Sequence, residues 1–262
     1  MKSIQVLVLV LLVSGSEARA LEWIENAEVG ELFRTAGVDG TFVLLDAAAQ
    51  TCTGHNEARA RKRFVPASTF KIPNTLIGLT VGAVQSVDEP LPYGGQPQPL
   101  KSWEKDMGLR EAIRVSNVPV YQALARRIGL ERMQENVSRL DYGNHEVGAS
   151  VDTFWLKGPL EISAIEQTQF LGRLAQDKLS FPAIHQASVR EIAKLDEGDG
   201  WVLYGKTGWA NFPDSGNGWW VGWVQRDRQI YSFALNMDLR DASEAGKRVE
   251  MGKACLKALG VL

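Results

Sequence analysis

The segment WVLYGKTGWANFPDSGNGWWVGWVQRDRQIYSFALNM (residues 201–237) decides the fold, because it carries three runs typical of β-strands. The runs WVLYGKTGW, WWVGWVQ and IYSFALNM are rich in aromatic and β-branched residues, which favour pleated, half-buried positions. Turn-forming dipeptides separate the runs, namely Asn217-Gly218 within DSGNG and Asp227-Arg228. The segment therefore predicts three consecutive antiparallel strands, with Trp219, Trp220 and Trp223 in the core or on the sheet surface.

The segments on either side predict two helices and a further hairpin. LEWIENAEVGELFRTAG (residues 21–37) has the apolar spacing of an amphipathic helix closed by Gly37. The runs TFVLLD and TCTGHN then predict a β-hairpin around residues 47–50. Near the other end, ASEAGKRVEMGKACLKALG (residues 242–260) predicts a helix with an apolar stripe. Arg248 lies on the side of this helix that faces the sheet, so its charge requires a partner there.

Residues 64 to about 194 are mostly helical in pattern. Residues 108–129 predict two helical pieces that are broken between Asn117 and Pro119. In ISAIEQTQFLGRLAQ, Ser163 and Glu166 have the spacing of a capping box. We therefore interpret Glu166 as a helix cap and not as a catalytic base.

The order of these elements predicts a mixed α/β (α+β) fold. One central antiparallel sheet of about five or more strands would be built from both ends of the chain, as layered architectures require. The terminal helices would flank one face, and an inserted all-helical lobe would cover the other. We expect a single domain over residues 21–262, with a sheet lobe (21–63 and 196–262), a helical lobe (64–195) and a cleft between them.

Residues 1–20 have the pattern of a secretory signal peptide. Lys2 precedes an apolar run from Ile4 to Val13, and the small residues end in Ala18-Arg19-Ala20. An apolar run of about ten residues is too short for the roughly 20 that span a bilayer. We expect export to the periplasm, with a soluble mature chain and no membrane partner after cleavage.

Charge and cysteine content exclude some classes of function. The 262 residues carry a formal net charge of −2 and no basic tract, so we expect no nucleic-acid partner. Cys52 and Cys255 could form a disulfide in an exported protein or remain buried thiols. The composition predicts a globular protein, either a monomer or a homodimer.

The run PASTFK (residues 66–71) contains the first candidate for chemistry. Ser68 and Lys71 would lie on one face of a helix that begins near Ser68, where the helix dipole favours developing negative charge. The same S-x-x-K spacing recurs at Ser102–Lys105 in charged surroundings, and we interpret that copy as surface. Pro73 lies unusually close to the expected helix interior. Taken alone, the first copy could equally be a capping serine with a surface lysine.

A serine nucleophile needs a base, and the histidines do not supply an obvious one. None of His55, His145 and His185 lies in a nucleophile motif. A neutral lysine can serve when burial lowers its pKa, and Phe70 and Val118 could provide that burial around Lys71.

A second candidate group lies on the first predicted strand after the helical lobe. Lys206 and Thr207 offer a cation and a hydroxyl to a carboxylate, and Gly208 allows a ligand to approach the backbone closely. S-x-x-K on a helix, Ser116 in the helical lobe and Lys-Thr-Gly on a returning strand form a specific combination, although each string alone is weak.

This combination resembles the class D (oxacillinase-type) serine β-lactamases. The motifs S-x-x-K, S-D-N and K-T-G mark the related penicillin-binding and β-lactamase proteins. Here the second motif is Ser116-Asn-Val118, with valine in place of the polar third residue. Two further strings match class D, Tyr142-Gly-Asn144 and Phe154-Trp-Leu156. The resemblance covers essentially the whole mature chain and implies one penicillin-binding/β-lactamase-like domain.

The resemblance also implies a role for each matched residue. Ser68 would be the acylated nucleophile, and Lys71 would carry a carbamate from carbon dioxide (N6-carboxylysine) that acts as general base in acylation and deacylation. The indole N–H of Trp155 would hold that carbamate, with Val118 and Leu156 as walls. Carbon dioxide or bicarbonate would be the sole cofactor, without a metal. The remaining roles would be proton relay by Ser116 beside Lys206, carboxylate binding by Thr207 and Arg248, and an oxyanion hole from the backbone N–H groups of Ser68 and Trp209.

Three functions follow from the resemblance. The first is hydrolysis of small-molecule β-lactam antibiotics, which would confer resistance. The alternatives are a β-lactam sensor that stays acylated and a D,D-peptidase acting on peptidoglycan. Absence of a preceding membrane segment argues against the sensor, and Val118 with the Phe154-Trp-Leu156 string argues against the peptidase.

The resemblance further implies that no disulfide joins the first hairpin, because Leu45 occupies the place of the partner of Cys52.

Overall fold

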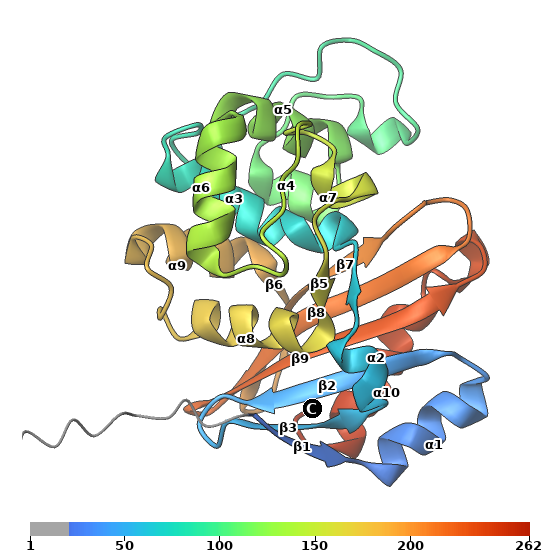
Figure 1. Ribbon diagram of the computed structural model, residues 1–262. Helices are drawn as coiled ribbons and strands as arrows, with labels where there is room; N and C mark the ends of the chain where they lie inside the picture. Colours follow the sequence, from blue (N-terminus) through green and yellow to red (C-terminus); the bar gives the residue numbers. More distant parts are fainter. Residues whose placement is uncertain (1–20) are drawn as a thin grey trace, which may run out of the picture.

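A computed structural model describes residues 21–262, in which seven strands form one sheet in the order β1-β3-β2-β9-β8-β7-β6 (Figure 1). The predicted signal peptide, residues 1–20, lies outside the described residues. Neighbouring strands are antiparallel except β1 and β3, which are parallel. The expected central sheet from both ends of the chain is therefore confirmed. The strands are β1 (Glu22–Glu25), β2 (Gly40–Asp46), β3 (Thr51–His55), β6 (Lys194–Gly198), β7 (Trp201–Trp209), β8 (Gly216–Arg226) and β9 (Gln229–Leu239).

The pairing of β2 with β9 joins the two ends of the chain. Val43 lies opposite Ala234 in the middle of this ladder. The predicted hairpin of β2 and β3 is present, with Leu45 opposite Cys52. Cys52 and Cys255 are both buried and free. Burial raises the pKa of the Cys52 thiol to about 11 and that of Cys255 to about 12, so both stay protonated at neutral pH.

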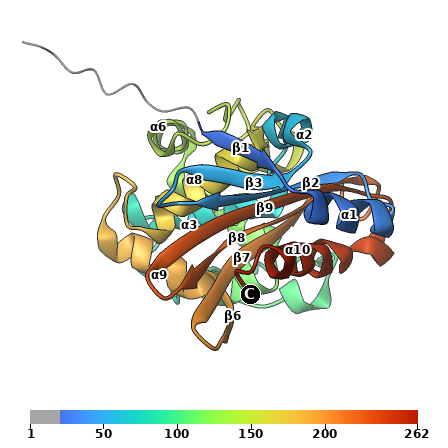
Figure 2. The same ribbon diagram turned by 90° about the horizontal axis from the view of Figure 1, so that it is seen from below.

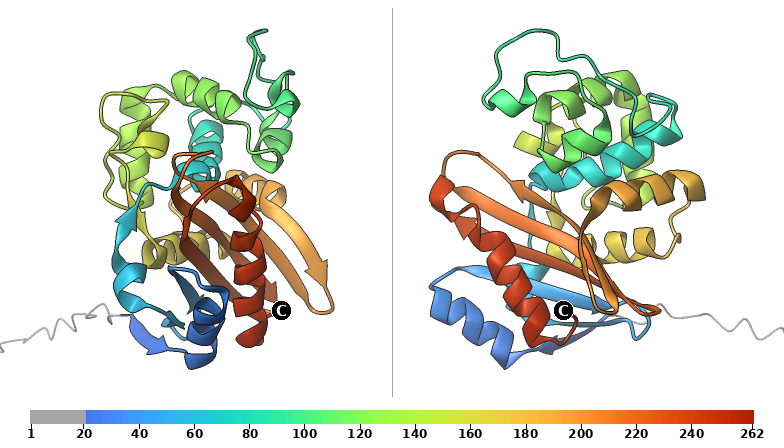
Figure 3. Two further views of the ribbon diagram at one scale, coloured as in Figure 1. Left: turned by 90° about the vertical axis from the view of Figure 1, so that its right-hand side faces the viewer. Right: turned by 180° about the vertical axis from the view of Figure 1, so that it is seen from behind.

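Helices cover both faces of the sheet, as Figures 2 and 3 show. The terminal helices α1 (Ala27–Ala36) and α10 (Lys247–Ala258) pack side by side on one face. Helix α8 (Ala164–Ala175) packs against β2, β8 and β9 on the other face. The remaining helices are α2 (Glu57–Arg61), α3 (Lys71–Thr80), α4 (Leu109–Arg114), α5 (Val118–Ile128), α6 (Leu130–Leu140), α7 (Phe154–Lys157) and α9 (Ala183–Ala193). The 3₁₀ turns are η1 (Ala67–Phe70), η2 (Lys101–Trp103) and η3 (Ala242–Glu244), and β4 (Arg63–Phe64) and β5 (Ile162–Ser163) form a small second sheet.

Two hydrophobic layers follow from the period of two along each strand. Trp219 and Trp223 on β8 are buried toward the helical side, whereas Trp220 between them is buried toward the terminal helices. Successive side chains on a strand point to opposite faces, so this alternation is the expected one. Burial of a side chain of this size stabilises the fold by roughly 1.5–3 kcal/mol. Within residues 21–262, no helix combines the length and apolarity needed to cross a membrane.

Two details of the sequence prediction were wrong. Residues 22–25 form strand β1 and not the start of a helix, because α1 begins only after Asn26, whose side chain accepts a hydrogen bond from Val29 N and caps the helix. Asn217 and Gly218 lie inside β8, and the chain turns at residues 210–215 instead. Gly218 is small for packing reasons, since a Cβ there would meet Leu239 Cδ1 at 2.5 Å.

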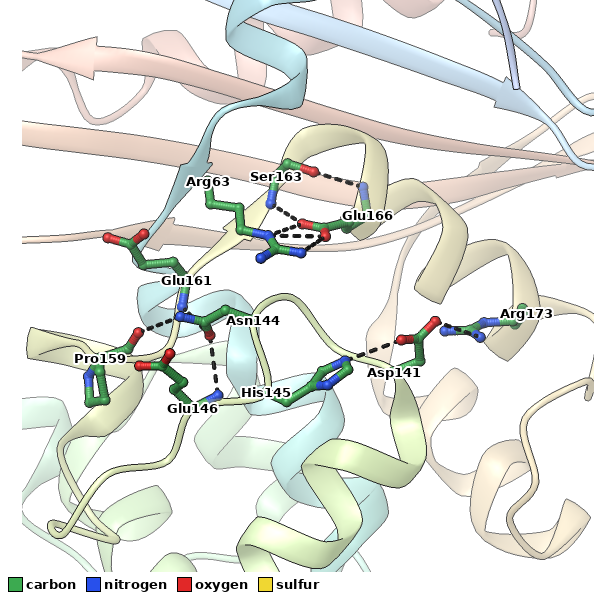
Figure 4. A network of polar contacts seen from close by, with 10 residues as sticks. All are labelled: Arg63, Asp141, Asn144, His145, Glu146, Pro159, Glu161, Ser163, Glu166 and Arg173. Atoms are coloured by element: carbon green, nitrogen blue, oxygen red, sulfur yellow. Dashed lines mark hydrogen bonds and ion pairs between the residues drawn. The ribbon is translucent and has the colours of Figure 1, made fainter. Parts of the chain in front are cut away.

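The capping box of α8 is confirmed and extends into a wider polar network. Ser163 Oγ accepts from Glu166 N, and the Glu166 carboxylate accepts from Ser163 N. Glu166 also forms an ion pair with Arg63 (Figure 4). Burial alone would raise the pKa of Glu166, but hydrogen bonds from Arg63 and Ser163 outweigh burial and lower the pKa. Glu166 therefore acts as a charged cap, as predicted.

Asn144 ties together the loops on either side of α7 (Figure 4). Its Oδ1 accepts from Glu146 N at 3.2 Å and from Glu161 N at 3.1 Å, and its Nδ2 donates to Pro159 O at 2.8 Å. The preceding Gly143 has a φ of +59°, and a Cβ there would lie 2.0 Å from Glu161 O. The Tyr142-Gly-Asn144 string thus holds the segment that follows α7.

We expect Asn144→Ala to lower the free energy of unfolding by about 2–3 kcal/mol, because three hydrogen bonds are lost and their partners are left behind. Asn144→Asp keeps the two hydrogen bonds that Oδ1 accepts and loses only the one that Nδ2 donates, so its free energy of unfolding should fall by about half as much. Urea unfolding of the three proteins measures the differences. Equal stability of Asn144→Ala and the parent would contradict this role for the side chain.

Candidate active site

Ser68 and Lys71 are in direct contact. Lys71 Nζ donates a hydrogen bond to Ser68 Oγ at 2.8 Å. The expected helix is divided in two, because Ser68 lies in η1 and α3 begins at Lys71. Pro73 falls in the first turn of α3, where amide groups lack intrahelical acceptors, so it fits without breaking the helix. Ala67, before the serine, has a left-handed φ of 49°, an uncommon conformation for a residue other than glycine.

Lys71 is a buried amine without a carboxylate partner among the described residues. Its side chain is 1% exposed, and its Nζ lies 5.3 Å from the centroid of the Tyr121 ring. Burial, followed by the nearby charge of Lys206, holds the pKa of Lys71 well below its ordinary value. Burial therefore favours the neutral form of this amine.

Trp155 lies behind the same residues. Its ring stacks on Phe70, with centroids 5.5 Å apart, and it is fully buried. Its Nε1 has no hydrogen-bond partner within the described part of the chain. A buried indole N–H without an acceptor is costly, so the core beside Phe70, the residue before Lys71, contains one unused donor.

Ser116 is held at the break between α4 and α5, with a left-handed φ of 57°. Asn117 Oδ1 caps α5 by accepting from Val120 N at 3.0 Å. On the other side, Trp103 Nε1 donates to Val115 O at 3.0 Å. Both contacts fix the short segment that presents the Ser116 hydroxyl.

Lys206 connects Ser116 to strand β7. Its Nζ donates to Ser116 Oγ and Thr207 O, both at 3.0 Å. The side chain is 6% exposed. Burial, with a further contribution from the charge of Arg248, lowers the pKa of Lys206 to about 7. Near neutral pH this amine can therefore either hold or accept a proton.

Arg248 lies against the end of β7. Its Nη1 donates to Gly208 O at 2.5 Å, and its Nε donates to Ala245 O at 2.9 Å. Its guanidinium lies 5.5 Å from the centroid of the Trp209 ring, a cation–π distance. The partner expected for this charge is therefore the backbone, and burial lowers the pKa of Arg248 to about 10.

Gly208 is required by the chain itself. A Cβ at this position would meet Pro66 O at 2.9 Å and Thr69 Cγ2 at 3.0 Å. From the sequence we expected a ligand to approach the backbone closely at Gly208. In the structure the segment that approaches Gly208 closely is η1. This contact sets the nucleophile turn directly against β7.

Two backbone N–H groups border the cleft. In an antiparallel pair, hydrogen-bonded residues alternate with residues whose polar groups face away. Ala210 N donates to Asn217 O, so the neighbouring Trp209, paired with Gly218, directs its N–H away from β8 and toward the side of η1. Ser68 lies in the first turn of η1, whose leading N–H groups lack intrahelical acceptors.

These residues surround a cleft of about 450 Å³. Ser68, Ser116, Val118, Leu156, Thr207, Gly208, Trp209 and Arg248 line it, while the buried Lys71, Trp155 and Lys206 lie behind its wall. The structure thus brings all of the predicted site residues together. Sequence reasoning missed several further lining residues, among them Pro99, Leu100, Trp103, Val115 and Phe212. Trp103 lies within the S-x-x-K copy at residues 102–105 and is buried. A single tryptophan among polar and charged residues was the one signal in the sequence that this segment packs against the protein.

The histidines lie elsewhere in the structure. His55 contacts Glu25, His145 contacts Asp141 and His185 contacts Thr80. Among residues 21–262, no group of three or more His, Cys, Asp or Glu side chains is placed to hold a metal ion. Lysine is accordingly the base nearest to Ser68 in the described chain.

Comparison with known proteins gives one consistent result. Residues 40–257 match the model of the penicillin-binding protein transpeptidase domain. β-Lactamase OXA-10 of Pseudomonas aeruginosa is 37% identical over 91% of both chains, and OXA-48 of Klebsiella pneumoniae is 38% identical over 95% of this chain and 94% of its own. The crystal structure of FUS-1 (OXA-85), a class D β-lactamase from Fusobacterium nucleatum subsp. polymorphum, is 46% identical, with a TM-score of 0.88 over 91% of this chain and 100% of its own.

We expect Lys206→Met to be more stable than the parent, because the buried amine has a pKa of about 7 in the folded chain and an ordinary value of 10.5 when unfolded. Between pH 7 and pH 10.5 the unfolded parent binds more protons than the folded parent, so its free energy of unfolding rises with pH. Below about pH 7 the folded parent must bury the charged amine, and its stability is lowered by the full amount. The advantage of the variant should shrink by about 1.4 kcal/mol per pH unit across that window. Urea unfolding at pH 6, 7, 8 and 9 measures it, and an advantage that does not change with pH would contradict the shifted pKa.

Proposed function

The chain belongs to the class D β-lactamases, and we propose that it hydrolyses β-lactam antibiotics through an acyl-enzyme on Ser68, with carbamylated Lys71 as the general base. The observation that carries this proposal is the contact between Ser68 Oγ and a buried lysine whose pKa is held well below its ordinary value by burial. A serine hydroxyl becomes a nucleophile only when an adjacent base accepts its proton. Hydrolysis of these antibiotics would confer resistance.

The surroundings of Lys71 fit a carbamate. Only a neutral amine captures carbon dioxide, and burial lowers the pKa of Lys71, which favours its neutral form. The orphaned Nε1 of Trp155 supports this fit, because a donor would stabilise a negative group within an apolar pocket. A carbamate on Lys71 would supply a general base for both half-reactions.

In acylation, Ser68 Oγ would bond to the lactam carbonyl carbon as its proton passes to the base. The backbone N–H groups of Ser68 and Trp209 would stabilise the negative oxygen. The C–N bond of the ring then breaks, and Ser116 would deliver a proton to the nitrogen. Lys206, hydrogen-bonded to Ser116, would replace that proton and in turn take up the one that the base removed from Ser68, so that the base is free for the next step. Thr207 and Arg248 line the cleft beside these groups and would hold the substrate carboxylate.

In deacylation, a water molecule would give its proton to the base and attack the ester carbon. The bond from that carbon to Ser68 Oγ breaks, and the proton returns to Ser68. The base is again the group that Lys71 carries, so both steps depend on one side chain.

The signal pattern of residues 1–20 supports a periplasmic location, where β-lactams act.

The proposal predicts that added bicarbonate raises the turnover of a chromogenic β-lactam, and that Lys71→Ala stops turnover because deacylation has lost its base. Mass spectrometry should find an acyl-enzyme that forms more slowly on Lys71→Ala than on the parent but then persists, and no adduct on Ser68→Ala. Full turnover by Lys71→Ala would overturn the proposal.

The same measurements separate the two alternatives. A persistent adduct on the parent protein with negligible turnover would identify a sensor. Cleavage of a peptide ending in D-Ala-D-Ala at a rate above that of β-lactam hydrolysis would identify a D,D-peptidase.

Trp155→Phe tests the carbamate directly, since it removes the indole N–H and keeps an aromatic ring. A hydrogen bond to a charged group is worth about 1.5–3 kcal/mol, so the bicarbonate concentration for half-maximal turnover should rise at least about tenfold. Trp23→Phe, in β1 and remote from the cleft, is the matched control. An unchanged bicarbonate requirement in Trp155→Phe would remove this role from Trp155.

A further inference from the structure

A second cleft, of about 410 Å³, lies along the same strand as the Ser68 cleft. It is bordered by α4, by the end of α9 with the start of β6, by β7 and by α10. Its apolar lining is formed by Ile113, Ile192, Leu195, Leu203, Trp220 and Val249. Leu203 and Trp220 are almost fully buried and form the core beneath the cleft, whereas Leu195 is exposed and Val249 half-buried, so these two present apolar surface to a ligand. The volume is within the range of small-molecule sites.

The pairing of β6 explains why a cleft exists at this point. Strand β6 pairs with β7 only from Trp201 to Tyr204, and its ladder contains a bulge between Lys194 and Asp196. From Gly205 onward this edge of β7 has no neighbouring strand. The second cleft occupies the first part of the open edge, and the Ser68 cleft occupies the part beyond it.

The two clefts meet at Lys206 and Thr207. Thr207 lines both of them, and Lys206 lines the second cleft while its Nζ contacts Ser116 of the first. A ligand in the second cleft would therefore share a residue with the proposed catalytic group without occupying the space in front of Ser68.

The charges around the second cleft favour an anion. Most of its cations already have carboxylate partners: Arg110 pairs with Asp88 and Glu191, Lys194 with Glu197, and Lys253 with Asp196. Two do not. Arg114 is exposed and makes no hydrogen bond or ion pair recorded within residues 21–262, and Lys206 contacts only hydroxyl and carbonyl oxygens in that range.

We propose that this second cleft is a binding site for small amphipathic monocarboxylates, whose carboxylate pairs with Arg114 and whose apolar part lies on Leu195 and Val249. A guanidinium is well suited to a carboxylate because it can donate two parallel hydrogen bonds. The apolar lining selects an anion with a hydrocarbon body over inorganic ions. The site itself rests on the geometry of the cleft and not on the proposed β-lactam hydrolysis.

Hexanoate is a suitable probe, and hexan-1-ol is its neutral counterpart of equal chain length. In amide-resolved NMR titrations of the unliganded protein, hexanoate should shift the resonances of residues around 113–114, 195, 205–206 and 249. Hexan-1-ol should bind at least about tenfold more weakly, because it lacks the charge that pairs with Arg114.

Arg114→Gln should weaken hexanoate binding at least about tenfold, and Arg114→Lys, which keeps the charge, should lose less. Arg228→Gln in the β8–β9 turn is the matched control, since Arg228 is also an exposed arginine. All three substitutions are on the surface, so folding is preserved, and β-lactam turnover of Arg114→Gln should equal that of the parent.

Absence of hexanoate-induced shifts would overturn the site. Shifts confined to residues of the Ser68 cleft, or equal affinities of Arg114→Gln and Arg228→Gln, would also overturn it. A protein that bound hexanoate as described but hydrolysed no β-lactam would contradict the proposed function and leave the second site standing.

Discussion

The structure around Ser68 depends on one constraint, the burial of an amine without an opposing carboxylate. A buried charge is expensive unless it is paired, and a buried lysine avoids that cost by losing its proton. Lys71 is almost fully buried, with its Nζ over the Tyr121 ring of α5, and the adjacent Phe70 of η1 packs against Phe154 and Trp155 of α7. Lys206 is a second buried amine, and its charge lowers the pKa of Lys71 further. The fold thus gives up stability to keep basic groups next to a hydroxyl.

Three distant parts of the chain must meet for this to happen. The pairing of β2 with β9 brings the ends of the chain into one sheet, and the contact at Gly208 places η1 against β7. The break between α4 and α5 supplies Ser116 from the helical side. Because each contact comes from a different element, the cleft forms only when both sides of the molecule are assembled.

Much of the fold followed from local patterns. The β-strand runs at residues 201–237, the first hairpin and the capping box at Ser163 are strong signals that depend on nearby residues. Strands β1 and β6 were missed because they are short, exposed edge strands whose pairing is decided by tertiary contacts. The order of the motifs predicted which residues would gather at the site. It could not reveal that Trp103 lines the cleft, or that Gly208 is small to admit η1, since both depend on segments remote in sequence.

The two free thiols have a consequence for where such a chain can fold. Cys52 faces Leu45 across the hairpin, and Cys255 is buried under the other face of the sheet, so neither has a partner for oxidation. Stability comes from packing and hydrogen bonds instead of cross-links. The native state is therefore indifferent to the redox poise of its compartment, and maturation requires no thiol oxidase or disulfide isomerase.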